Sequence, residues 1–168
     1  MRLATVEDVY AAQLGDLRSA ERQLLEALPA MADAASDRKL QQAFAQHLEQ
    51  TECHLERLDE VITSSPSPVP NDRCEAMQGL ISEVTKIIRA DGPGEVKDVA
   101  LIAAAQRVEH YEISAYGTAR ALADQLDQGD ARALLGETLE EEGQADELLT
   151  KLATGGLIVA GLNERAQP

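Results

Sequence analysis

The chain has 168 residues, of which 30 are acidic and 15 are basic, so its formal charge is −15. This charge argues against nucleic acid as a partner, because phosphate binding requires a basic surface, and against anionic membranes. A hydrophobic content of 44% with 2% aromatic residues indicates a folded helical domain rather than a disordered chain or a β-sandwich.

Helical periodicity and helix-ending residues predict four long helices, over residues 5–35, 37–63, 95–126 and 131–153. Thr5 should cap the first helix, and Pro29 should kink it. A Pro-rich linker (residues 64–70) and a short amphipathic helix (74–90) join the second long helix to the third. A long crossover at this place is typical of the all-α, ferritin-like four-helix bundle. We therefore expect a bundle domain over residues 1–155 and a C-terminal tail over 156–168.

Several polar residues fall on the apolar faces of these helices, because each residue advances a helix by ~100°. They are Glu21 on the first helix; His47, Thr51 and His54 on the second; Glu109 and Glu112 on the third; and Glu142 on the fourth, with Asp146 one turn on and to one side. One such carboxylate, taken alone, usually lies at a bundle rim or beside a polar neighbour. Four at matched depth need protons or cations, since an unpaired buried charge costs several kcal/mol. Carboxylate oxygens with imidazole suit iron, manganese or zinc.

Five segments carry a family resemblance: DLRSAERQLLEALPAMA, HLEQTECHLERLDEV, CEAMQGLI, ALIAAAQRVEHYEISAYGTA and LEEEGQADELLTKLA. Together they resemble the YciE/YciF family of bacterial ferritin-like stress proteins, with VEHYEISAYGT as the most specific part. The resemblance implies a homodimer with a rubrerythrin-like core.

The resemblance also implies a di-iron motif, onto which Glu21, His54, Glu109, Glu112 and Glu142 match residue by residue. Two positions depart from it. Thr51 stands where a second-helix Glu is expected, and Ala145 stands where a fourth-helix His is expected. These departures leave three alternatives open: a single metal ion, an altered dinuclear site in which His47 or Asp146 substitutes as a ligand, or an empty polar core.

These patterns leave two functions open. The first is a stress-response protein with a carboxylate-rich metal site that handles oxygen or peroxide. The second is a non-enzymatic bundle for stress or interaction, with a degenerate, metal-free core. The N-terminus lacks the apolar stretch of a signal peptide, no apolar run approaches a membrane span, and Cys53 and Cys74 show no metal-ligand spacing. We therefore expect a cytoplasmic protein with reduced thiols.

Overall fold

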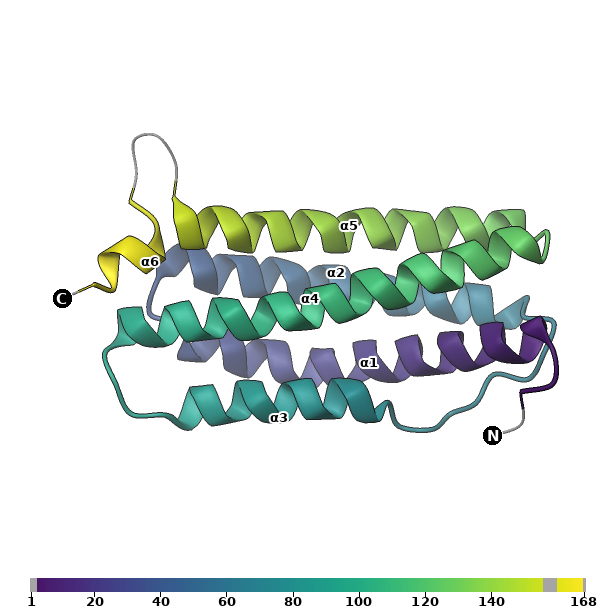
Figure 1. The fold of residues 1–168 in the computed structure, drawn as a ribbon, viewed down its shortest axis with the longest axis horizontal. Helices are drawn as coiled ribbons and strands as arrows, with labels where there is room; N and C mark the ends of the chain where they lie inside the picture. Colours follow the sequence, from purple (N-terminus) through teal and green to yellow (C-terminus); the bar gives the residue numbers. More distant parts are fainter. Residues whose placement is uncertain (1–2, 156–159, 168) are drawn as a thin grey trace.

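The structure is a computed structural model that describes residues 3–155 and 160–167. Its elements are α1 (Val6–Ala34), α2 (Arg38–Thr63), α3 (Glu75–Arg89), α4 (Gly94–Gln125), α5 (Gly129–Thr154) and α6 (Leu162–Arg165). The four long helices α1, α2, α4 and α5 lie side by side, and α3 packs along α1 and α4 (Figure 1). These described residues form no strand. The predicted all-α bundle with a helix in its crossover is therefore confirmed.

Short polar residues set where α1 and α2 begin. Thr5 accepts a hydrogen bond from the amide of Asp8 at 3.3 Å, and Asp8 accepts one from the amide of Thr5, which completes a capping box. Asp37 caps α2 by accepting from the amides of Lys39 and Leu40. The helix α1 continues through Pro29, whose ring lies on the exposed face.

The crossover between α2 and α4 lies against α1. Arg18 donates a hydrogen bond to the carbonyl of Pro70 at 3.2 Å, and the amide of Cys74 donates to Ser19 Oγ at 2.8 Å. Gly15 makes this approach possible, because a Cβ atom there would lie 2.7 Å from the Pro70 carbonyl oxygen. Small and polar residues on one side of α1 therefore bring α3 into register with the bundle.

The C-terminal segment returns to the bundle. Leu162 of α6 is buried in the apolar core, and Arg165 Nη2 lies 2.6 Å from Asp37 Oδ2 at the start of α2. Residues 156–159 and 168 of the predicted tail lie outside the described residues. The division of the chain at residue 155 stays a prediction.

The apolar core consists of two clusters with a polar layer between them. One cluster includes Leu14 and Leu17 of α1, and the other includes Leu24 and Leu28 of the same helix. Glu21 lies between the two pairs and is completely buried. In the described part of the chain, no helix is long and apolar enough to cross a membrane. The feature that needs a chemical explanation is the polar layer.

Candidate metal centre

Four helices supply the side chains of the polar layer. Helical spacing aligns His47, Thr51 and His54 on α2, at positions i, i+4 and i+7, and aligns Glu109 with Glu112 on α4 at i and i+3. Glu21, Thr51, His54, Glu112 and Glu142 have no exposed surface, and Glu109 and His47 are 4% and 5% exposed. The structure therefore brings together the inward-facing residues that the helical periodicity predicts.

The potential ligand atoms form two groups that share Glu142. In each group, one atom from every residue lies within 4.8 Å of the others. The groups are His47, Glu109, Glu112 and Glu142, and Glu21, His54 and Glu142. We call them the His47 position and the His54 position. In the first, His47 Nε2 lies 3.6 Å from Glu109 Oε1 and 3.7 Å from Glu142 Oε2. In the second, His54 Nδ1 lies 3.0 Å from Glu142 Oε1 and 3.4 Å from Glu21 Oε1.

The polar layer contains many buried atoms that make no hydrogen bond. They are Oε2 of Glu21, both ring nitrogens of His47, Oγ1 of Thr51, Nδ1 of His54, Oε2 of Glu109, and both carboxyl oxygens of Glu112 and Glu142. None of these atoms has a hydrogen-bond partner within residues 3–155 and 160–167. Buried polar atoms are normally paired, since each unsatisfied group costs about 1–3 kcal/mol. These oxygen and nitrogen donors face one another across gaps that suit a bound cation, so the residues fit a metal site.

Three of the four carboxyl groups of this layer, those of Glu21, Glu109 and Glu112, resist ionisation when only protein surrounds them. Burial raises the pKa of Glu109 and Glu112 well above the usual value, and the nearby charge of Glu142 raises it further. Burial also raises the pKa of Glu21, whose carboxylate accepts a hydrogen bond from Tyr116. Burial, the largest single influence, acts in the same direction on Glu142, but the contacts with His54, His47 and Glu109 together leave its pKa below the usual value.

The carboxylates around His54 favour its charged form. Burial alone would lower its pKa, but contacts with Glu142 and Glu21 raise the pKa to about 10. Its second ring nitrogen, Nε2, lies 2.9 Å from Glu141 Oε2, and Arg57 makes an ion pair with the same carboxylate. His54 therefore has carboxylates at both ring nitrogens, two from the buried layer and one from nearer the surface.

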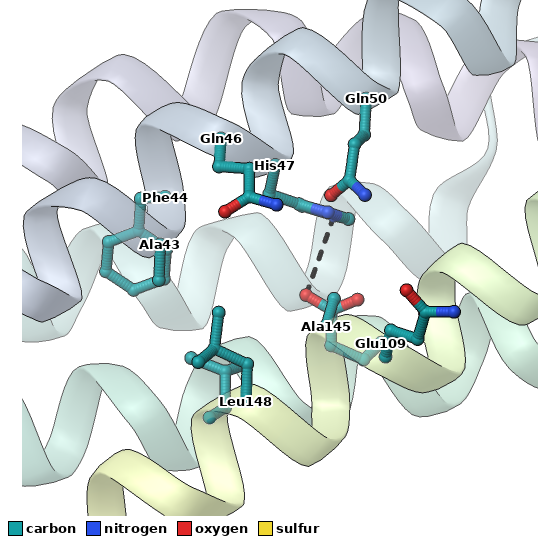
Figure 2. A pocket seen from close by; sticks show the side chains of 10 residues that line it. Ala43, Phe44, Gln46, His47, Gln50, Glu109, Ala145 and Leu148 are labelled. Atoms are coloured by element: carbon teal, nitrogen blue, oxygen red, sulfur yellow. Dashed lines mark ion pairs between the residues drawn. The ribbon is translucent and has the colours of Figure 1, made fainter.

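A small pocket leads from the surface to the His47 position. It has a volume of about 60 Å³, enough for a few water molecules, and lies between α2 and α5. Exposed Gln46 and Gln144 line its outer part, and Ala145 leaves room where a larger residue would fill it. Figure 2 shows His47 and Glu109 facing each other at the pocket, joined by their ion pair. A small molecule could reach the His47 position by this route.

Comparison with known proteins assigns the family. A family profile described as a domain of unknown function, DUF892, matches residues 5–164. The chain belongs to the DUF892 family. It is 46% identical to the protein YciF of Escherichia coli (strain K12) over 168 residues, which cover 99% of this chain and 98% of that protein. The resemblance to the YciE/YciF family is thereby confirmed.

Solved structures agree with this assignment. The crystal structure of the E. coli stress protein YciF matches with a TM-score of 0.86 and 49% identity, covering 89% of this chain and 95% of that one. YcfI of Rhodopseudomonas palustris matches with a TM-score of 0.84 and 38% identity, with the same coverage of both chains. The bundle described above is therefore the architecture of this DUF892 group.

The structure separates the two substitutes that the sequence suggests for the missing ligands in this DUF892 chain. His47 lies in the cluster with Glu109, Glu112 and Glu142. Asp146 lies outside it. The Asp146 carboxylate accepts a hydrogen bond from Gln106 at 3.0 Å, and it lies 3.8 Å from the exposed His110.

Sequence reasoning missed two residues beside the cluster. Glu141 is not among the inward-facing residues that the periodicity predicts, and its side chain is 29% exposed, yet it reaches the buried ring of His54. Helical periodicity does not single out Arg57. It lies three residues after His54 on α2, and this spacing is the only signal in the sequence that could have pointed to it.

Proposed function

We propose that this chain is a stress-response protein whose bundle core binds two divalent transition-metal ions and handles a small oxidant, oxygen or peroxide. The observation that carries the proposal is the set of buried, unpaired ligand atoms contributed by four helices. The description of YciF as a stress protein, at 49% identity over most of both chains, supports the biological setting.

Charge and ligand type favour two ions. The four carboxylates of the layer carry four negative charges when ionised, and two divalent cations would neutralise them. With His47 and His54, the layer offers four carboxylates and two imidazoles, the same donors as the dinuclear carboxylate sites of helical bundles. Their distribution differs, because both imidazoles come from α2 and two of the carboxylates come from α4. Iron, manganese and zinc accept such donors.

The side chains have distinct tasks in this proposal. One ion would be held by His47, Glu109 and Glu112, and the other by Glu21 and His54. Glu142 would contribute to both positions. Bound iron would supply the electrons that reduce oxygen or peroxide. The apolar clusters above and below exclude bulk water from the layer, and the hydrogen bond from Tyr116 fixes the Glu21 carboxylate. The pocket beside Ala145 would admit the oxidant.

A second function has its own support. Thr51 and Ala145 each replace a ligand of the motif that the family resemblance implies, and the protonated His54 already pairs with Glu142. Protons could therefore balance the remaining carboxyl groups in a metal-free bundle. In this case the chain would be a non-enzymatic stress or interaction protein.

Elemental analysis of protein purified without a metal-affinity tag separates the two functions. We expect about two equivalents of iron, manganese or zinc per chain, and their loss in the double variant Glu109→Ala/Glu112→Ala. The matched control is Glu49→Ala/Glu52→Ala, which removes two carboxylates with the same spacing from an exposed face of α2. Metal far below one equivalent, unrestored by anaerobic iron loading, would refute the proposal and favour the metal-free bundle.

The proposal also includes the homodimer that the family resemblance implies. Light scattering of the purified protein tests it directly. A mass near twice 18.1 kDa supports the dimer, and a mass near 18.1 kDa refutes it.

A further inference from the structure

The two imidazoles of the polar layer are held in different ways. The ring of His54 has a defined orientation, because Nδ1 faces Glu21 and Glu142 while Nε2 lies 2.9 Å from Glu141 Oε2. The ring of His47 has no hydrogen-bond partner at either nitrogen among the described residues. Glu141, which lies outside the ligand cluster, therefore fixes the ring of His54, whereas no described residue fixes the ring of His47 in this way.

Glu141 is itself fixed by Arg57. The guanidinium makes a bidentate contact, with Nη1 2.6 Å from Glu141 Oε2 and Nη2 3.1 Å from Glu141 Oε1. Arg57 Nη1 also donates to Thr138 Oγ1, one turn before Glu141 on α5. Bidentate pairs of this kind restrict both side chains more than a single contact does. A chain of contacts thus runs from the half-buried Arg57 through Glu141 to the completely buried ring of His54.

This geometry decides which ring nitrogen is available to a metal. A carboxylate that accepts from Nε2–H keeps the proton at that nitrogen, so the lone pair of a neutral ring lies on Nδ1. Nδ1 is the nitrogen that faces Glu21 and Glu142. Metal-binding histidines generally have such a partner on their second nitrogen, and its loss typically weakens metal binding 10–100-fold.

We propose that Glu141 is a positioning residue for the His54 position, held in place by Arg57, and that the His47 position has no equivalent. This inference rests on the proposed function, since it concerns the same metal site. It further implies that the two positions differ: the His54 position is preorganised and binds metal first, and the His47 position, beside the pocket, binds second.

Cobalt(II) titration of the metal-free protein, in competition with a chromophoric chelator, tests the proposal. We expect two unequal binding steps in the wild type. Glu141→Ala should weaken the tighter step 10–100-fold and leave the weaker step unchanged. Glu141→Gln should restore part of the loss, because its amide oxygen can still accept from Nε2–H. The control, Glu147→Gln, removes an exposed charge on the same helix that pairs with Lys151, and should bind as the wild type does.

Nitrogen NMR of the zinc-loaded protein gives a readout that a purely structural role would not move. In the wild type we expect His54 to carry zinc on Nδ1 and a slowly exchanging proton on Nε2. In Glu141→Ala this proton should exchange rapidly. If Glu141→Ala does not fold, as judged by circular dichroism, the comparison of Glu141→Gln with Glu147→Gln and the wild-type NMR assignment still decide the question.

The outcomes are distinguishable. Wild-type protein that binds neither cobalt nor zinc would refute the proposed function, and the role of Glu141 with it. Wild-type protein that binds both ions, with Glu141→Ala indistinguishable from it, would refute only the role of Glu141. Zinc on Nε2 of wild-type His54 would also overturn the inference, whatever the affinities are.

Discussion

Glu112 offers the sharpest test of whether the polar layer exists for binding metal rather than for stability. The side chain is completely buried, and both carboxyl oxygens lack a hydrogen-bond partner in the described part of the chain. Burial raises the pKa of Glu112 well above its usual value, so the metal-free fold disfavours the ionised carboxylate. We therefore expect that Glu112→Met stabilises the metal-free protein while it weakens metal binding.

The size of the effect follows from the missing hydrogen bonds. An unsatisfied buried polar group costs about 1–3 kcal/mol, and methionine removes that group while following a similar unbranched course. A free energy of unfolding that rises by about 2 kcal/mol corresponds to a melting temperature roughly 4–8 °C higher in a chain of this length. Glu112→Gln removes the ionisable group but leaves two polar atoms buried, so it should raise the free energy of unfolding much less.

Chelator-treated wild type, Glu112→Met and Glu112→Gln should be unfolded side by side in urea, followed by circular dichroism. Glu112→Met should be the most stable of the three proteins, and Glu112→Gln should be close to the wild type. If Glu112→Met is less stable than the wild type by about 1 kcal/mol or more, the unpaired carboxyl does not destabilise the fold as argued. If Glu112→Gln raises the free energy of unfolding as much as Glu112→Met does, the ionisable carboxyl group, and not the missing hydrogen bonds, accounts for the effect.

Three further predictions concern pH, the pocket and a buried cap. The pKa of His54 is raised from 6.5 to about 10, so the stability that its proton contributes is fully present below pH 6.5 and is lost as the pH rises towards 10. Urea unfolding of the metal-free protein should therefore show a free energy of unfolding that falls across this pH range, and a free energy that rises would contradict the prediction. Ala145→Leu fills the pocket, so iron(II) oxidation by peroxide should slow while the metal content at equilibrium stays the same; an unchanged rate would place the access route elsewhere. Asp98→Ala removes three hydrogen bonds that Ser36 and Asp37 donate to a buried carboxylate. It should lower the free energy of unfolding by about 3 kcal/mol without changing the metal content of loaded protein. Equal stability of variant and wild type in thermal unfolding would show that this cap contributes little.

The helical period made most of the polar layer predictable. Glu21 continues the apolar series of α1, and the spacing of Glu109 and Glu112 turns both side chains to the same side of α4. Direction relative to a helix axis is a local property, so it can be derived from the sequence. The same periodicity turns Glu26 and Glu49 away from the apolar faces, and both are exposed in the structure, although residue type alone would not exclude either as a ligand.

Contacts between helices were not predictable in this way. Whether Glu141 reaches His54 depends on the distance and rotation between α2 and α5, which periodicity does not give. Asp98 is a similar case, since it caps the turn between α1 and α2 from the start of α4, more than sixty residues away in sequence. Both side chains make their contacts with a different helix or turn from the one that carries them, and these contacts are visible only in the packed bundle.

The two departures from the motif acquire a different meaning once the bundle is known. Judged by position, Thr51 and Ala145 each remove a ligand, which suggests a degenerate site. Judged by donors, the layer still has four carboxylates and two imidazoles, because His47 enters it from α2. The charge to be neutralised and the ligand types govern metal binding more directly than which helix supplies each ligand. Ala145 in turn leaves the His47 position beside a pocket, where a larger side chain would close it. The substitutions therefore fit a rearranged site with an accessible position better than an abandoned one.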